Sequence, residues 1–316
     1  MASEPIAGEE LNLEFRLGLT PVRRVLRRVK ERVIEAALFL AAAASVLVTL
    51  GIVGALVYES STFFAHVSII EFLTGTQWTP LTADARFGVL PLVSGTLVTT
   101  AVALAVAIPV GTICAVWLSE YASHRIREVV KPALELLTAV PTVVFGYFAL
   151  LFVTPLLQRV IPNLPGFNML SAGLVIGVMV IPYVTSLSEE AMRAVPLALR
   201  EGAYALGATR IQVAWRVVFP AALSGISASY ILTVSRALGE TMIVAIAAGM
   251  QAKLTLNPTE PAATITAFIV QVSLGDLIHG SIGYQSIFAA GLVLLLMTLG
   301  LNILGFLIQR RYREAY

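Results

Sequence analysis

The chain has 316 residues, of which 58% are hydrophobic and only 13% are charged. Soluble domains carry about twice that share of charged residues, so the composition excludes an ordinary soluble domain and indicates a protein that folds in a membrane. The formal net charge is only +2, so the charged residues inform through their positions along the chain rather than through their sum.

Residues 1–32 form a basic N-terminal segment before the first apolar run. Pro21 opens a stretch in which arginines alternate with valine and leucine, and this pattern predicts an amphipathic helix at the membrane surface. The apolar run that follows is roughly 25 residues long, which is too long for a secretory signal, and it lacks a convincing cleavage site. We expect an uncleaved first helix preceded by a cytoplasmic segment.

Six apolar segments are long enough to cross a bilayer as helices. They cover residues 33–57, 89–118, 133–157, 170–187, 221–250 and 286–308. The sequence therefore predicts an all-α polytopic membrane domain over residues 33–308, followed by a short tail at 309–316.

The lysines and arginines predict the orientation of these spans. With the N-terminus inside, 17 of the 21 basic residues lie on the inner side, three lie outside, and Arg236 lies within a span. The positive-inside rule then places both termini in the cytoplasm. External loops are expected at 58–88 and 251–285, and a cytoplasmic loop at 188–220.

Two local patterns bear on helix packing. Pro141 lies in the third segment and removes a backbone hydrogen bond there, so it can kink that span. Gly173 and Gly177 form a Gly-x-x-x-Gly pattern in the fourth segment, which favours close packing against another helix. The aromatic side chains of the external loop 58–88 include Phe63, Phe64, Phe72 and Trp78. They suit either a docking surface or anchoring at the lipid interface.

The cytoplasmic loop 188–220 predicts a helix–turn–helix. Pro196 can open a short helix, because its missing N–H is harmless at that position. Gly207 is placed to adopt the left-handed backbone that ends the helix, and Thr209 with Gln212 matches a capping box that starts a second helix. An ordinary amphipathic surface loop is the alternative interpretation.

Arg236 and Glu240 are a charged pair inside the fifth apolar segment. Their spacing of four residues predicts that both project from one face of a continuous helix. A charge near the bilayer centre costs roughly 2.5–3.5 kcal/mol in contact with lipid, so the pair should face a bundle interior or an aqueous path. Arginine suits an oxyanion, because it offers several N–H donors. A packing salt bridge is the alternative.

Other kinds of site are not indicated. Cys114 is the single cysteine, so no internal disulfide forms, and the three histidines show no metal-ligand spacing,. None of the three lysines follows a glycine, so a phosphate loop for nucleotide binding does not occur here. We expect no catalytic residue, no metal and no cofactor on this chain. If the protein works in transport driven by ATP, another chain must bind the nucleotide.

The cytoplasmic loop resembles the EAA motif of ABC importer permeases, Glu-Ala-Ala-x3-Gly-x9-Ile-x-Leu-Pro. The residues at the fixed positions of the motif are Glu201, Gly202, Ala203, Gly207, Val217, Phe219 and Pro220. Gly202, Val217 and Phe219 depart from the motif conservatively, and the spacing agrees throughout. The resemblance implies a type I ABC importer permease fold. It also implies that Glu201, Gly202, Ala203, Leu206, Gly207 and Pro220 dock the ATPase that binds ATP and Mg²⁺.

Further segments are similar to PstC-type permeases of phosphate-specific ABC importers. They include residues 87–97 and 135–146, Ser119-Glu120-Tyr121 and Arg236-Ala237-Leu238-Gly239-Glu240-Thr241. This resemblance implies a substrate path that includes Arg236, Glu240 and Thr241. The implied partners are a PstA-like second permease, two PstB-like ATPases and an external PstS-like phosphate-binding protein, all at a bacterial cell membrane and without nucleic acid.

Two other functions stay open at this point. The same kind of machine could carry another oxyanion, such as sulfate or molybdate. A secondary transporter working alone is a different class, but it would be expected to show internal repeats, and we find none.

Overall fold

The computed structural model describes residues 21–311 except 81, 83, 276–277 and 279. The described part is helical, and the β-type pairing found in it is an isolated antiparallel bridge between Trp78 and Phe87. In chain order the longer helices are α2 (Pro21–Phe64), α4 (Leu90–Val116), α5 (His124–Ala139), α8 (Met169–Arg193), α12 (Leu223–Leu238) and α15 (Ile282–Arg311). The shorter ones are α3 (Ile69–Thr74), α6 (Thr142–Phe148), α7 (Thr154–Gln158), α9 (Leu197–Ala205), α10 (Arg210–Val213), α11 (Phe219–Ala221), α13 (Met242–Ala247) and α14 (Ile265–Ser273). Three π-helical turns continue these helices: η1 (Trp117–Tyr121), η2 (Ala149–Val153) and η3 (Ala214–Val218).

Four unbroken helical stretches of the described chain are long and apolar enough to cross a membrane. They are Lys30–Phe64, Leu90–Tyr121, Met169–Arg193 and Ile282–Leu307. The total reaches the predicted six if each of two bent helix pairs counts as one span. The predicted lead-in helix and first span are one helix, because α2 runs without a break from Pro21.

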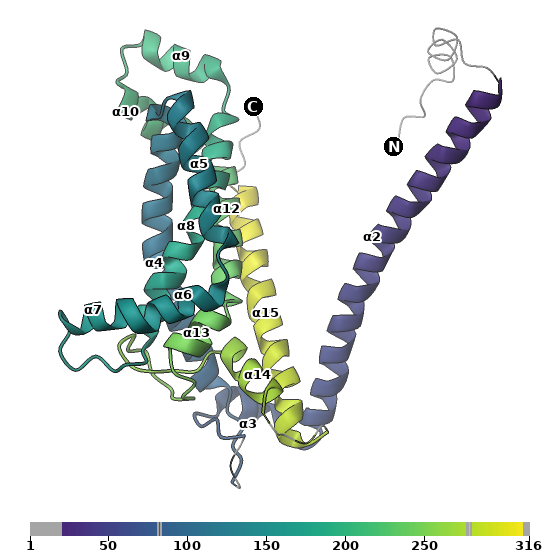
Figure 1. Cartoon of the computed structure of the whole chain (residues 1–316), viewed down its shortest axis with the longest axis vertical. Coiled ribbons are helices and arrows are strands. Elements are labelled where there is room, and N and C mark those ends of the chain that lie inside the picture. The colour runs from purple at the N-terminus through teal and green to yellow at the C-terminus, as the bar shows by residue number, and fades with distance from the viewer. Residues whose placement is uncertain (1–20, 81, 83, 276–277, 279, 312–316) are drawn as a thin grey trace. The chain divides into compact units, whose positions relative to one another are not determined.

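The predicted third span is not one straight helix. It is bent by 87° between α5 and the stretch Thr142–Gln158. Pro141 causes the break, since proline lacks an N–H and disfavours helical backbone at the residue before it. Val140 is accordingly extended, with ψ at 129°. In Figure 1, α6 and α7 run across the direction of α4 and α8.

The predicted fifth span, residues 221–250, is also wrong as a continuous helix. A 72° bend precedes α12, which then ends at Leu238. Gly239 follows, and glycine has low helix propensity. The chain resumes as the short α13 and leaves helical structure again at Ala248. The charged pair predicted from the sequence therefore lies at a helix break.

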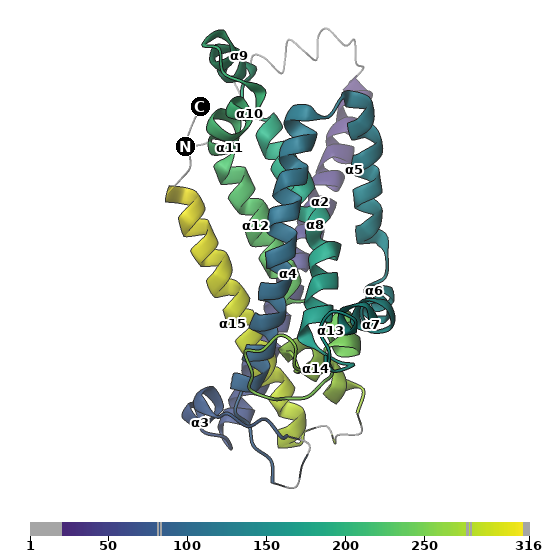
Figure 2. The same ribbon diagram turned by 90° about the vertical axis from the view of Figure 1, so that its left-hand side faces the viewer.

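The core of the bundle is formed by α4, α8 and α12, which pack on one another and lie side by side in both views (Figures 1 and 2). The Gly-x-x-x-Gly prediction of close packing is confirmed. A Cβ on Gly173 would lie 2.7 Å from the Val102 side chain, and one on Gly177 would lie 2.7 Å from the Ala103 carbonyl oxygen. The two glycines let α8 approach the backbone of α4.

Aromatic side chains close the end of the bundle near α3 and α14. Phe63, Phe72 and Trp78 are at most 3% exposed, and their rings meet edge to face. Both interpretations of these three residues, as a docking surface or as lipid anchors, are therefore wrong. The rings pack on one another and on Phe268, because burying aromatic surface is more favourable than leaving it in water.

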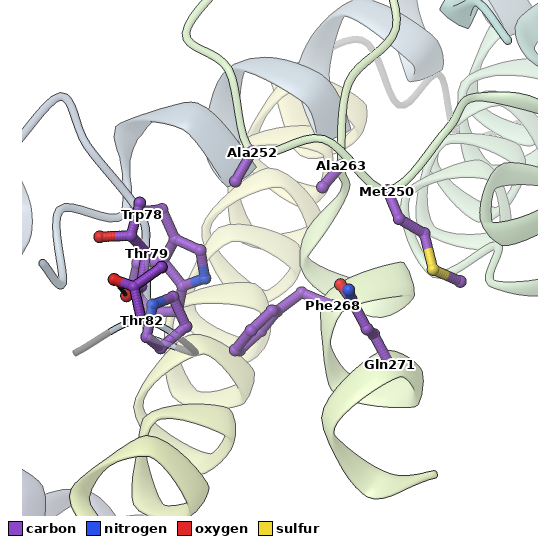
Figure 3. A pocket seen from close by; sticks show the side chains of 9 residues that line it. Trp78, Thr79, Thr82, Met250, Ala252, Ala263, Phe268 and Gln271 are labelled. Atoms are coloured by element: carbon purple, nitrogen blue, oxygen red, sulfur yellow. Dashed lines mark hydrogen bonds between the residues drawn. The ribbon is translucent and has the colours of Figure 1, made fainter. Parts of the chain in front are cut away.

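A small cavity of about 200 Å³ lies beside this aromatic cluster. Trp78, Thr79 and Thr82 line one side, and Met250, Phe268 and Gln271 line another (Figure 3). None of the described side chains that line it is charged. An oxyanion needs compensating positive charge when it leaves water, so this cavity is not the anion site.

Candidate functional site

Arg236 and Glu240 form the predicted ion pair. Nη1 of Arg236 lies 2.8 Å from Oε2 of Glu240. The Glu240 side chain is 2% exposed, whereas that of Arg236 is 34% exposed. The predicted geometry was wrong, because Glu240 lies beyond the end of α12 rather than one turn along it. Its N–H donates to the Ala237 carbonyl at 3.3 Å, and this turn keeps the carboxylate within reach of the arginine.

Buried hydroxyl groups hold the break in place. The Thr266 hydroxyl donates to the Glu240 carbonyl at 2.7 Å and lies 3.0 Å from the hydroxyl of Thr264. The next residue of α14, Ile265, donates its N–H to the Thr96 hydroxyl of α4 at 3.1 Å. Helix α14 thus holds the backbone of Glu240 and is itself bonded to α4, so elements far away in the sequence set the position of Glu240.

The Arg236 guanidinium keeps donors that the described part of the chain does not use. Arginine has five N–H donors, and among the described residues Glu240 is the partner of Arg236. Thr241, the third predicted path residue, is adjacent, and its hydroxyl donates to the Gly239 carbonyl at 3.2 Å. The structure thus brings all three predicted path residues to one helix break and leaves the arginine able to hold an oxyanion.

The predicted helix–turn–helix is confirmed. Helix α9 starts directly after Pro196, and Gly207 has φ at +81°. The N–H of Thr209 donates to the Gln212 side-chain oxygen at 2.8 Å, as a capping box requires. Local sequence is sufficient for this element, because each signal acts within a few residues.

The loop that contains α9 and α10 presents an exposed apolar surface. Leu197, Leu206 and Ile211 are 65%, 90% and 58% exposed. A Cβ on Gly202 or Gly207 would meet nothing within 4 Å. Of the other residues predicted to dock an ATPase, Glu201 and Pro220 are exposed and Ala203 is half-buried. Exposed leucine and isoleucine grouped in this way are typical of protein interaction sites.

Comparison with known families decides the class of this protein. The sequence pattern of the family described as "Binding-protein-dependent transport system inner membrane component" matches residues 107–314. The chain belongs to this family. It is a permease of the ABC importer type, as its relatives are.

Two relatives of the permease cover most of it. The chain is 33% identical over 307 residues to the "Probable ABC transporter permease protein YqgH" of Bacillus subtilis. The alignment covers 96% of this chain and 98% of that relative. The chain is also 33% identical over 280 residues to the "Phosphate transport system permease protein PstC" of Mesorhizobium japonicum, at 82% and 84% coverage.

Solved structures confirm the fold of the permease. A bacterial ABC transporter involved in the import of alginate superposes with a TM-score of 0.64 at 17% identity, over 92% of this chain and all of that one. The MetNI methionine ABC transporter gives 0.52 at 17% identity, over 72% and 95%. At this identity the likeness concerns fold alone.

The permease also buries acidic side chains that the sequence interpretation missed. Glu189 of α8 is fully buried, and its carboxylate lies 2.8 Å from Lys131 Nζ and 3.3 Å from Arg127 Nε, both on α5. Arg193 lies 3.6 Å away. The apolar pattern predicts a fourth segment that ends at residue 187, whereas α8 continues to Arg193. The i,i+4 spacing of Arg127 with Lys131, and of Glu189 with Arg193, is the signal that could have indicated paired helix faces.

Proposed function

We propose that this chain is one of two permease subunits of an ATP-driven phosphate importer in a bacterial cell membrane. The observation that carries the proposal is the Arg236–Glu240 pair, in which a partly exposed guanidinium keeps free donors beside one buried carboxylate. The relatives named as phosphate transport permeases support phosphate as the anion.

The chemistry of the pair suits a path better than a storage site. A phosphate that reaches Arg236 accepts hydrogen bonds from the N–H groups that Glu240 does not use. The planar guanidinium can bind two phosphate oxygens at once. The Glu240 carboxylate is held close to the guanidinium, and its negative charge weakens the attraction for a second anion. Conduction requires binding that is weak enough to allow release. A second arginine from the partner permease would complete the site.

The α9–α10 loop is the proposed contact with the ATPase. Its exposed apolar side chains and the open space at Gly202 and Gly207 suit a groove on another protein. ATP and Mg²⁺ would bind to that ATPase, since this chain has no phosphate loop. The proposed partners are a PstA-like permease, two PstB-like ATPases and a PstS-like binding protein outside. Both termini would lie in the cytoplasm.

The decisive experiment is reconstitution of the complete complex in liposomes with the phosphate-binding protein. We expect phosphate-dependent uptake and a phosphate-stimulated rate of ATP hydrolysis. Sulfate and molybdate, each with its own binding protein, serve as the comparison. Stimulation by either one in place of phosphate would support the permease function but overturn the substrate. Uptake without any ATPase would indicate the secondary transporter class instead.

Cysteine labelling tests the orientation separately. Cysteines at Ser68 and Thr259 should react from outside, and cysteines at Ser123 and Thr209 only from inside. Labelling of position 209 from outside would contradict a cytoplasmic coupling loop.

A further inference from the structure

The segment Ser119-Glu120-Tyr121 ends the helix formed by α4 and η1, and the proposed function gives it no role. Its side chains touch both helices of the α9–α10 loop. Glu120 lies 3.3 Å from Nη2 of Arg200 on α9, and the Cζ of Arg210, the first residue of α10, lies 5.3 Å from the ring centre of Tyr121. Two consecutive residues of one membrane helix therefore contact two different helices of the loop.

The ion pair of Arg200 and Glu120 is buried, with side chains that are 13% and 6% exposed. Arg200 also donates to the Val195 and Met192 carbonyls, at 2.6 and 2.7 Å. One guanidinium thus joins α9 to the end of α8 and to the end of η1. The Ser119 hydroxyl donates to the same Glu120 oxygen at 2.9 Å and orients it.

A third arginine fixes the segment from the other side. The Arg127 guanidinium of α5 donates to the Leu118 carbonyl at 3.1 and 2.7 Å. An arginine at the carboxyl end of a helix satisfies carbonyls that have no partner within the helix. The segment is therefore bound to the bundle through α5 and to the loop through α9 and α10.

These contacts differ from the apolar packing nearby. Val213, Ala214 and Val218 bury the loop against Val116 and Met192. Such contacts are non-directional and tolerate sliding. A buried charge pair with defined donors has one preferred geometry, because moving either partner leaves a buried charge unpaired.

We propose that Glu120 and Tyr121 are positioning residues that transmit movement of the α9–α10 loop to α4. This role rests on the proposed function. When the ATPase displaces α9, Arg200 moves Glu120 with it, and when α10 moves, Arg210 displaces Tyr121. Helix α4 packs along α8 and contacts the Glu240 break through Thr96 and α14. Loop movement then reaches the anion path.

The test uses the complete complex reconstituted in liposomes, with anion uptake and ATP hydrolysis measured together. Glu120→Gln keeps the shape and an acceptor oxygen but removes the charge that holds Arg200. We expect normal assembly and basal hydrolysis, with about a tenfold lower ratio of anion transported per ATP hydrolysed. Glu128→Gln is the matched control, since Glu128 on α5 pairs only with His124 among the described residues and is 64% exposed. It should keep the wild-type ratio.

A second pair of variants tests Tyr121 without touching the buried charge. Tyr121→Phe keeps the ring face for Arg210 and should transport normally, whereas Tyr121→Leu should lower the ratio. An unchanged ratio in Glu120→Gln, or an equal loss in Glu128→Gln, would overturn the inference. If the wild-type complex responds to sulfate or molybdate and not to phosphate, the proposed substrate fails. The same ratio is then measured with the anion that stimulates hydrolysis, so the two failures stay distinct.

Discussion

Buried carboxylates occur in two regions of this permease, and their cations differ. Glu189, at the end of the bundle that carries α9, faces Arg127, Lys131 and Arg193, of which the first two are only 14% and 22% exposed. Glu240 faces Arg236, which is 34% exposed. Cations that surround one buried carboxylate use their charge to stabilise the fold. A single, more exposed cation still has N–H donors with which it can bind a ligand.

The strongest test of this difference is Arg236→Ala. We expect phosphate uptake to fall to background while the complex assembles normally, because the proposed role of this charge is to bind the anion. Arg236→Lys should recover little, since an ammonium lacks the planar donor fork. Uptake and yield of the assembled complex are the two measurements.

If Arg236 served packing instead, the result would reverse. Arg236→Ala would then lower the yield of the complex by leaving Glu240 unpaired, and Arg236→Ala combined with Glu240→Ala would restore it. Near-normal uptake by a well-assembled Arg236→Ala complex would contradict the path assignment.

Glu189→Ala should lower stability rather than transport chemistry. Removing this carboxylate leaves Arg127 and Lys131 close together without their shared partner. Breaking a buried ion pair costs about 3–5 kcal/mol in the free energy of unfolding, which a lower thermal midpoint of the purified complex would report. Glu190→Ala is the control, because Glu190 is 62% exposed and should cost less than about 1 kcal/mol. Equal midpoints for the two variants would show that the buried network is not structural.

Gly207→Val should weaken association with the ATPase. The positive φ of Gly207 strains any β-branched residue by about 1–2 kcal/mol, and the added side chain also fills the open space at the corner. Gly207→Asn separates the two effects, since asparagine tolerates left-handed backbone. We expect it to retain the loop conformation but still reduce co-purification of the ATPase. Full ATPase binding by both variants would argue against this docking surface.

The smallest effect is expected at the Lys253–Glu260 pair, which lies in the loop after α13 with its charged atoms 2.6 Å apart. Hydrogen bonds from Lys253 and Thr255 hold the pKa of Glu260 below its ordinary value of 4.5. Because the folded-state pKa is lowered, the pair contributes fully above that ordinary value and is lost only as the pH falls through the lowered one. Glu260→Gln should therefore lower the thermal midpoint slightly and equally from pH 8 to pH 6.

Asp84→Asn removes a longer and more exposed contact, 3.7 Å from Arg86, and should leave the midpoint unchanged. A difference between wild type and Glu260→Gln that disappears between pH 8 and pH 6 would contradict the lowered pKa.

The sequence by itself determined the membrane character, the approximate positions of the apolar segments and the helix–turn–helix around Gly207. Each depends on composition or on signals a few residues apart, such as Thr209 with Gln212. It also indicated Arg236 and Glu240 as partners, because their spacing along the chain is short.

Only the tertiary structure decided where the helices break and which charges are buried. The turn at Glu240 is held by Thr266 and α14, and the bend at Pro141 redirects α6 across the bundle. Lys131, a partner of Glu189, lies 58 residues away along the chain, and Arg200, the partner of Glu120, lies 80 residues away. Local i,i+4 spacing can indicate a charged helix face but not which distant helix meets it, because the burial of a charge depends on the helices that surround it once the bundle packs.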